Sequence, residues 1–362
     1  MWLEKFKKIQ SHKPKKGGIM KKWMKVAMVI TVLAVMVMVG CKDEVVEPEL
    51  TESEILVEYL IAQDLDLTDI LSGWIITAFD VHENLGDYYV IDVRSQEKYD
   101  LGHIPGAVWA DASNILEVAA DNGGKTIVVH CYKGIGATKL VTALRLSGFP
   151  TAMSMKFGMS AWGLSDAAEE TVVYDKWTSA CSDAALEYPA DWLLTATTPA
   201  EDTEYNYPII ETGEEAGADI LAARVATLLT DGYGYASAPD ILTLSDDYFI
   251  NNYWDEDSWN KYGHIKGAHR INSLSLETGG INNLDSEETI VTYCWTSQTS
   301  GMITAYLTVL GYDAQSLMNG ANGLIYSNLE THAWGLGENV NPLVDVVPGK
   351  NAPGVYELEA TQ

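Results

Sequence analysis

Short apolar runs alternate along this chain with segments in which apolar residues recur every three or four positions. Thr126–His130 is a β-branched run of the kind that forms a buried strand. Cys131 follows it directly, and a glycine-containing loop then leads into an apolar stripe that ends at Gly148. This order predicts a strand, a thiol at its carboxyl end, and a helix. The stripe consists of Ala137, Leu140, Val141 and Leu144.

The same arrangement recurs further along the chain. Residues 289–293 form a second apolar run, Cys294 follows it, and another apolar stripe leads to Gly311. Matching residues lie 161 to 163 positions apart. Solenoid repeats are only about 20 to 50 residues long, so this spacing indicates duplication of a domain. The matching pairs are His103 and His264, Cys131 and Cys294, Gly148 and Gly311, and Gly158 and Gly320.

Strand and helix alternate in both copies, which is typical of a parallel sheet covered by helices on both faces. The fold class predicted is therefore α/β. The length of 362 residues and the hydrophobic content of 47% are enough for two such domains, each with its own core. Helices are expected at 52–62, 76–85 and 220–229, and further strands at 88–93, 151–155 and 241–244.

These patterns divide the chain into six parts. The folded copies are separated by a linker rich in Tyr, Pro, Thr and acidic residues, which we expect to lie along the domain surfaces. The expected parts are a signal segment (1–40), an acidic spacer (41–72), a first domain (73–170), the linker (171–215), a second domain (216–340) and a tail (341–362).

The N-terminus has the pattern of a targeting segment. Lys21, Lys22 and Lys25 precede the apolar run 26–39, and Gly40 and Cys41 end it. This resembles a bacterial lipoprotein signal. The resemblance implies lipidation of Cys41, contact with a membrane through that lipid, and a location in the bacterial cell envelope. An uncleaved membrane anchor is the alternative, but fourteen residues are short of the roughly 20 that span a bilayer.

Charge excludes one class of partner. The net charge is −28, and because residues 1–40 hold nine Lys and one Glu, the remainder carries −36. Such a surface repels nucleic acid, so no nucleic-acid partner is expected.

Seven His and four Cys show no ligand spacing, so no metal site is expected either. No cofactor is implied, and the sequence does not identify protein partners.

The position of Cys131 gives its thiol a chemical role. Loop amides and the N-terminus of a helix direct positive charge at one point, where they stabilise a thiolate, a persulfide or an oxyanion. The thiol can then act as a nucleophile without a neighbouring base. A buried structural Cys is the alternative, but the repetition at Cys294 argues against it. Cys181 lies in the linker and is read as a linker residue, with pairing to an active-site Cys left open.

Four motifs occur in order in the first copy. They are Asp-x-Arg at 92–94, Gly-His-Ile-Pro-Gly-Ala at 102–107, the loop after Cys131, and Gly-x-x-Ala-Trp at 158–162. Together they resemble the rhodanese domain. The two copies, over 73–170 and 216–335, resemble tandem thiosulfate and mercaptopyruvate sulfurtransferases. The resemblance implies a doubly wound α/β domain whose Cys accepts a sulfane sulfur from a small anionic donor and passes it to cyanide or a thiol.

The residues after each Cys are the expected binding loops. Lys133 is the only cation there, and it either lowers the thiol pKa or attracts the donor, or else is a solvated surface charge. Thr138 is expected to cap the following helix and to donate to the bound anion. The second loop has no charge but offers several hydroxyl groups. The loop residues are Tyr132, Lys133, Gly134, Ile135, Gly136, Ala137 and Thr138, and Trp295, Thr296, Ser297, Gln298, Thr299 and Ser300.

The second copy departs from the motif pattern. By spacing, 242–245 is placed opposite 91–94, which implies an insertion of 10 residues before His264 and the loss of both charges of the Asp92 and Arg94 pair. That pair is read as structural, and His103 and His264 as turn histidines. We therefore expect Cys131 to be the principal persulfide carrier.

Cys294 is expected to be a second carrier.

A phosphatase is disfavoured because Ala137 and Thr138 stand where an oxyanion-binding Arg is needed. The remaining alternative is a non-catalytic, envelope-anchored module that binds a partner or senses sulfur species.

Overall fold

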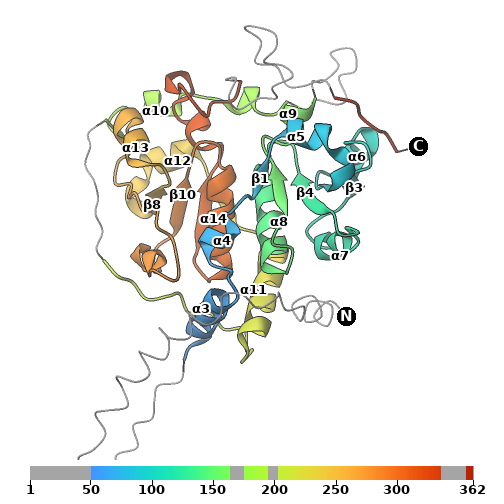
Figure 1. Ribbon diagram of the computed structural model, residues 1–362. Helices are drawn as coiled ribbons and strands as arrows, with labels where there is room; N and C mark the ends of the chain where they lie inside the picture. Colours follow the sequence, from blue (N-terminus) through green and yellow to red (C-terminus); the bar gives the residue numbers. More distant parts are fainter. Residues whose placement is uncertain (1–49, 164–174, 195–202, 336–355, 362) are drawn as a thin grey trace, which may run out of the picture. The chain divides into compact units, whose positions relative to one another are not determined.

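The computed structural model describes residues 50–163, 175–194, 203–335 and 356–361 (Figure 1). The expected signal segment and Cys41 lie outside these residues. Within the described ranges no helix is both long enough and apolar enough to span a bilayer. Residues from Thr51 onward cluster as one unit, whose described residues form a five-stranded, a four-stranded and a two-stranded sheet.

Among the described residues, the first half of this unit has a five-stranded sheet in the order β1-β5-β4-β2-β3, with every neighbouring pair parallel. Its central strands are buried over most of their length, as helix-covered parallel strands are. The strands are β1 (Ile75–Ile76), β2 (Tyr88–Asp92), β3 (Val108–Trp109), β4 (Thr126–His130) and β5 (Met153–Met155). The helices are α5 (Ala78–Glu83), α6 (Gln96–Leu101), α7 (Ile115–Ala120), α8 (Ile135–Leu146) and α9 (Met159–Trp162).

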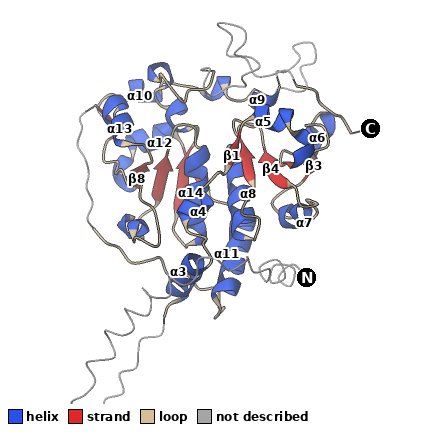
Figure 2. Ribbon diagram, in the orientation of Figure 1, coloured by secondary structure: helices blue, strands red, loops and turns tan. Residues whose placement is uncertain are grey.

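The second half repeats this topology, with parallel strands in the order β7-β11-β10-β8. A parallel bridge between Asn251 and His269 stands where β3 pairs in the first half. Helices lie beside the strands of both sheets (Figure 2), so the predicted α/β fold with two similar domains is confirmed. The strands are β7 (Gly234–Ala236), β8 (Phe249–Asn252), β10 (Ile290–Tyr293) and β11 (Ala314–Leu317). The helices are α11 (Gly217–Asp231), α12 (Ala238–Thr243), α13 (Glu256–Tyr262) and α14 (Gln298–Val309).

The strand register corrects the alignment of the two copies. Asp92 pairs with His130 in the first sheet, and Asn252 pairs with Tyr293 in the second. Asn252 therefore occupies the place of Asp92. The predicted strand 241–244 is wrong, because it falls on helix α12 and the turn after it; Ser237 caps that helix and Pro239 lies in its first turn.

The predicted insertion before His264 is also wrong. The supposed extra residues are strand β8 and helix α13, both of which have counterparts in the first half, β2 and α6. A short apolar run such as 241–244 is compatible with either a helix or a buried strand. The two Asn residues of β8 interrupt the apolar pattern that would indicate a buried strand there. The helix predicted at 76–85 is shorter than expected, because the chain first forms β1 and then α5.

Part of the expected acidic spacer belongs to the fold. Helix α3 (Glu52–Ala62) begins with a capping box from Thr51 and Glu54 and buries Leu56 and Leu60 completely. Helix α4 (Leu67–Ile70) follows it. The buried Asp66 carboxylate accepts hydrogen bonds from the Ser275 hydroxyl (2.6 Å) and from the Leu276 amide (2.9 Å). The spacer prediction is therefore corrected for 51–71, since these residues pack against the second half.

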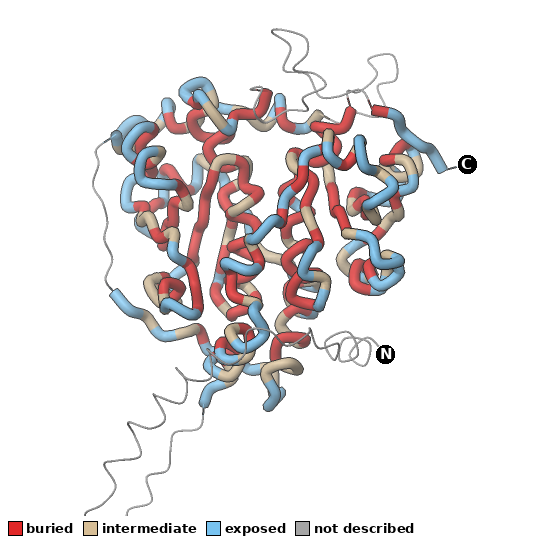
Figure 3. Tube along the Cα trace, in the orientation of Figure 1, coloured by how far each residue is buried: buried red, intermediate tan, exposed pale blue. Residues whose placement is uncertain are grey.

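The two halves meet through helices that occupy equivalent places in the duplicated unit. Helix α8 packs against α14, and α3 packs against α11 (Figure 1). Buried residues run along the strands and along these helices (Figure 3). The duplicated unit therefore includes the helix that precedes each first strand, and it begins earlier than expected.

Segments that follow each half cover a turn of the other half. After the first half, the linker forms α10 (Ala184–Glu187) and β6 (Trp192–Leu193), and β6 pairs antiparallel with β9 (His264–Ile265). After the second half, Glu359 forms an antiparallel bridge with His103. The linker expected along the surface therefore packs on the fold, and Trp177 within it is fully buried.

Candidate active site

The loop after β4 is held against the segment that follows β5. Gly134 has a φ of +77° and starts α8 without a side-chain cap. The amide of Met159 donates to the Cys131 carbonyl at 2.8 Å, and the Ser160 hydroxyl donates to the Tyr132 carbonyl at 2.8 Å. A side chain at Gly158, whose φ is +57°, would collide with the Cys131 carbonyl. The Gly-x-x-Ala-Trp motif thus fixes the backbone of the Cys loop.

Backbone amides surround the Cys131 thiol, which is partly exposed. Burial raises the pKa of Cys131, and hydrogen bonds from four loop amides act against that rise. A side chain at Gly136 would meet only the Cys131 sulfur, at 3.7 Å, so the loop leaves space beside the thiol. The amides come from Lys133, Gly134, Gly136 and Ala137.

Lys133 is bound to the second half of the molecule. Its Nζ donates to Asn319 Oδ1 at 2.6 Å and lies 5.7 Å from the centre of the Trp177 ring. Burial lowers the pKa of Lys133, while negative charge on the nearby thiols of Cys131 and Cys181 opposes this effect. Lys133 is therefore not a solvated surface charge.

Thr138 does not have the expected capping role. It lies within the first turn of α8, and its hydroxyl donates to the Ile135 carbonyl at 2.6 Å. Gly134 occupies the N-cap position. The proton of the Thr138 hydroxyl is thus already used inside the loop.

The second Cys loop has the same backbone but a different interior. Cys294 is almost fully buried, with 2% of the residue exposed, and the Ser300 amide donates to its sulfur at 3.4 Å. The Ser297 hydroxyl donates to the Leu317 carbonyl at 2.5 Å, and the hydroxyls of Ser300 and Ser316 are 2.8 Å apart. These two of the expected hydroxyl donors therefore face the core.

Each Cys loop contacts the turn that follows the last strand, β5 or β11, of the other half. Lys133 of the first loop binds Asn319, and Gln298 of the second loop accepts from the Phe157 amide at 3.4 Å. Phe157 and Asn319 are themselves equivalent, each with a positive φ, of 61° and 65°. An ideal Cβ built at Gly301 would collide with the Thr138 hydroxyl. The two loops therefore face each other across a local pseudo-twofold axis where α8 and α14 cross.

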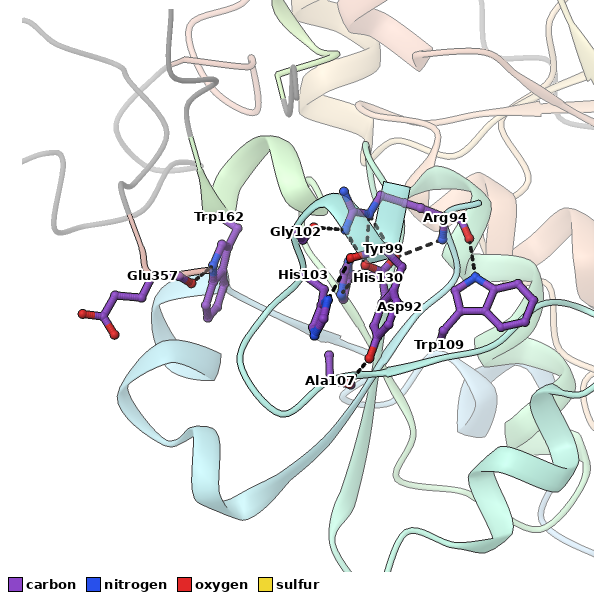
Figure 4. Close-up of polar contacts among 10 residues, drawn as sticks. All are labelled: Asp92, Arg94, Tyr99, Gly102, His103, Ala107, Trp109, His130, Trp162 and Glu357. Carbon is purple, nitrogen blue, oxygen red and sulfur yellow. Dashed lines mark hydrogen bonds and ion pairs between the residues drawn. The ribbon is translucent and has the colours of Figure 1, made fainter. Parts of the chain in front are cut away.

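A buried charged cluster supports the first loop (Figure 4). Arg94 donates through Nε and Nη2 to the Asp92 carboxylate at 3.0 and 2.5 Å, and through Nη2 to the Gly102 carbonyl at 2.7 Å. Burial opposes the charge of Asp92, but His130 and Arg94 outweigh this effect and lower its pKa. Burial lowers the pKa of His130 to about 4. The pair thus ties the end of β2 to the turn at 102–107.

The expected turn histidines lie in stacked positions. His103 stacks on Tyr99 at 3.8 Å, and its Nδ1 is 2.8 Å from the Tyr99 carbonyl oxygen (Figure 4). His264 stacks on Trp259 at 3.6 Å, and burial lowers its pKa to about 4. These contacts give both histidines structural places beside the turns.

Several residues at the site were not expected from the sequence. His130 precedes the thiol and is fully buried, while Asn319 and Trp177 hold Lys133 and its carbonyl in place. Tyr233 approaches Thr138, with 3.2 Å between the two hydroxyl oxygens. The equivalence of Asn319 and Phe157, 162 residues apart, was a signal available in the sequence. The linker Trp and the tyrosine had none.

The fold and the two loops define an α/β protein that holds a thiol among backbone amides at the carboxyl end of a parallel sheet. The Rhodanese-like domain family matches the chain twice, at residues 77–165 and 250–324. Thiosulfate sulfurtransferase GlpE from Pseudoalteromonas translucida is 30% identical over 77 residues, which are 21% of this chain and 73% of that protein. GlpE from Pseudomonas fluorescens is 32% identical over 81 residues, covering 22% and 74%. The chain belongs to the rhodanese-like family.

Two solved structures are also similar to parts of this chain. A rhodanese-related protein from Thermoplasma volcanium is 26% identical, with 25% of this chain and 89% of that chain covered and a TM-score of 0.23. A thiosulfate sulfurtransferase from Pseudomonas aeruginosa is 15% identical, with 74% and 46% covered and a TM-score of 0.27. The family match and the curated relatives, rather than these scores, support an enzyme of the sulfurtransferase type.

Proposed function

We propose that this protein transfers a sulfane sulfur from thiosulfate or a similar donor to cyanide or a thiol through a persulfide on Cys131. One observation carries the proposal: Cys131 is a partly exposed residue, and its thiol faces four backbone amides. Amides in this arrangement stabilise a thiolate and then a persulfide anion without a neighbouring base. The GlpE relatives, which are named thiosulfate sulfurtransferases, support the choice of donor.

The reaction has two displacements. The Cys131 thiolate attacks the outer sulfur of thiosulfate, the S–S bond breaks, and sulfite leaves with the bonding electron pair. The acceptor then attacks the terminal sulfur of the persulfide, and the Cys131 thiolate leaves. With cyanide the product is thiocyanate, and with a thiolate it is a new persulfide. The loop amides hold negative charge at the same place in both steps.

The two thiols have unequal parts in this proposal. Cys294 is the weaker candidate carrier because it is almost fully buried and two hydroxyls of its loop bind core atoms. The closed second loop is the observation that favours the alternative function, in which the second half binds a partner or senses sulfur species.

We also propose that a lipid on Cys41 anchors the protein in a bacterial envelope. The support is the basic segment, the apolar run 26–39 and the Gly40–Cys41 end in the sequence. Labelling with a radioactive fatty acid in cells that express the full chain and its Cys41→Ala variant tests this idea. We expect label on the full chain and none on the variant; equal labelling of both, or of neither, would contradict lipidation of Cys41.

Intact mass measured on the fragment lacking residues 1–41 tests the transferase proposal. The protein is treated with thiosulfate and then with cyanide, with Cys131→Ser and Cys294→Ser measured alongside. We expect the mass to rise by one sulfur atom and to return after cyanide, with release of thiocyanate. The gain should vanish in Cys131→Ser and persist in Cys294→Ser. No added sulfur from thiosulfate, mercaptopyruvate or polysulfide would favour the binding function.

A further inference from the structure

Two tyrosines of the second half approach the Cys131 loop. The Tyr233 hydroxyl oxygen is 3.2 Å from that of Thr138, and the Tyr235 hydroxyl donates to that of Tyr233 at 3.2 Å. The two rings are 5.1 Å apart. Because Thr138 lies in the first turn of α8, just after the loop that holds the Cys131 thiol, these phenols extend from the second half to the first active-site loop.

The direction of the hydroxyl chain follows from its inner end. Thr138 donates its proton to the Ile135 carbonyl, so Tyr233 must donate to Thr138, and Tyr235 in turn donates to Tyr233. Tyr235 is 40% exposed and is the outer end of the chain. Its hydroxyl can therefore turn outward to a ligand, while Tyr233 keeps its bond to Thr138.

Crowding on the inner side holds the chain in place. A Cβ at Gly301 of α14 would lie 2.7 Å from the Tyr233 hydroxyl and would also collide with Thr138. The absence of a side chain at 301 thus leaves the room that Tyr233 and Thr138 use. Burial raises the pKa of Tyr235 and outweighs the hydrogen bond with Tyr233, which lowers it, so the phenol stays protonated and remains a hydrogen-bond donor.

The first half has no tyrosines equivalent to Tyr233 and Tyr235. Strand register places Tyr235 opposite Ser316 on β11, and Ile75 opposite Ser154 on β5. By the same register Gly73 is the counterpart of Tyr233. The first half therefore has Gly73 and Ile75 where the second half has Tyr233 and Tyr235, the two tyrosines that approach the Cys131 loop.

We propose that Tyr235 determines donor specificity at the Cys131 site by donating a hydrogen bond to an oxygen of an oxyanion-bearing sulfur donor, and that Tyr233 is a positioning residue whose ring packs against that of Tyr235. This inference rests on the proposed sulfurtransferase function. A sulfane donor without oxygen, such as inorganic polysulfide, gains nothing from this contact. The site then favours donors of the thiosulfate or thiosulfonate class through a residue of the opposite half.

Steady-state kinetics with two donors test the inference. Thiosulfate and inorganic polysulfide are compared, with cyanide as acceptor, in the wild type and in Tyr235→Phe and Tyr233→Phe. We expect Tyr235→Phe to raise KM for thiosulfate by at least about tenfold, the effect of one hydrogen bond to a charged oxygen, with kcat little changed. KM for polysulfide should stay within about twofold, because no hydrogen bond to it is lost. Tyr233→Phe keeps the ring contact and removes only the acceptor that competes for the Tyr235 proton, so it should not raise the thiosulfate KM.

A tyrosine at the other end of the same half gives the matched control. Tyr248 is half-buried and precedes β8, at the amino end of the parallel strands, so Tyr248→Phe should leave both donors unaffected. Equal changes for the two donors in Tyr235→Phe, or no change for either, would overturn the inference while leaving the proposed function intact. A wild type that takes sulfur from neither donor would overturn the proposed function itself and the inference with it.

Discussion

The two Cys loops share one backbone and differ in what surrounds the sulfur. Cys131 is partly exposed beside a cation, whereas Cys294 is 2% exposed and has no charged residue in its loop. Behind the first loop Arg94 lies 5.3 Å from the centre of the Tyr132 ring. At the equivalent place in the second half, Trp254 stacks on Trp295 at 4.3 Å. Duplication thus preserved the loop geometry while a buried ion pair gave way to an aromatic stack.

The features that the two loops share are those that shape the backbone, whereas the features that differ surround the sulfur. Both halves keep the turn residues that shape the loop, since Gly158 and Gly320 each lie against the carbonyl of their own Cys. Ser297 even holds a φ of +62°, a conformation that glycine adopts more readily, and its hydroxyl is bonded to the core. The second loop is therefore preserved as structure, and its Gln298 also accepts a hydrogen bond from the Phe157 amide of the first half.

Labelling of the thiols should show the largest difference between the halves. In the native protein we expect a neutral alkylating reagent to modify Cys131 at least about a hundredfold faster than Cys294, because a buried thiol reacts only after local opening, and opening by about 3 kcal/mol gives that factor. Pulse labelling followed by peptide mass analysis measures both rates.

Cys181 provides an internal control for this labelling. It is partly exposed like Cys131, but burial raises its pKa to about 12, so at neutral pH we expect it to react more slowly than Cys131. In denaturant the three thiols should react alike. Native Cys294 reacting as fast as Cys131 would contradict the closed second loop.

The buried His130 of the first half should make the free energy of unfolding depend on pH. Tyr293 occupies the equivalent place in the second half and has no such effect near neutral pH. Burial lowers the pKa of His130 from 6.5 to about 4. Between these values the unfolded chain binds a proton that the folded chain does not, so stability should fall as the pH falls through this window, by up to about 3 kcal/mol. Urea unfolding from pH 7 to 4 measures the loss.

His130→Asn should reduce the loss of stability between pH 6.5 and 4, whatever it does to stability at pH 7. His264, whose pKa is also lowered to about 4 by burial, should maintain the rest of the loss. An unchanged slope in His130→Asn would count against a neutral buried histidine.

The sequence predicted the elements that carry strong local signals. The strand and helix around Cys131 fall where the β-branched run and the apolar stripe placed them, and helix 52–62 has the predicted bounds. The second copy was misaligned because β8 contains Asn251 and Asn252, whose burial depends on tertiary partners. Contacts between the halves, such as Lys133 with Asn319, join residues far apart in the chain, and no local pattern encodes them.

The crossing of α8 and α14 should tolerate a side chain on one helix only. Ala normally stabilises a helix relative to Gly by about 1 kcal/mol, but at Gly301 its Cβ would collide with the Thr138 hydroxyl. We expect Gly301→Ala to destabilise the protein by about 1 to 3 kcal/mol through overpacking. The loss should shrink in the double variant with Thr138→Ala, and urea unfolding of the four proteins measures the coupling.

Gly86→Ala is the control for this cycle, because an added Cβ there meets nothing within 4 Å and its φ is ordinary. It should change stability little. If Gly301→Ala stabilises the protein, or if its effect is the same with and without Thr138, the two helices do not cross at these residues.

The smallest expected effect concerns the segments that cover the equivalent turns. The turn at His264 is covered by β6 of the linker, and the turn at His103 by Glu359, whose carboxylate also accepts from the Gly106 amide at 3.0 Å. Glu359→Ala removes that acceptor but keeps the backbone bridge, so we expect a loss of about 0.5 to 1 kcal/mol in urea unfolding. Glu357→Ala is the matched control, since only its backbone carbonyl binds Trp162 (Figure 4). Equal losses in the two variants would show that the acidic end of the chain acts through charge rather than through the hydrogen bond to the turn.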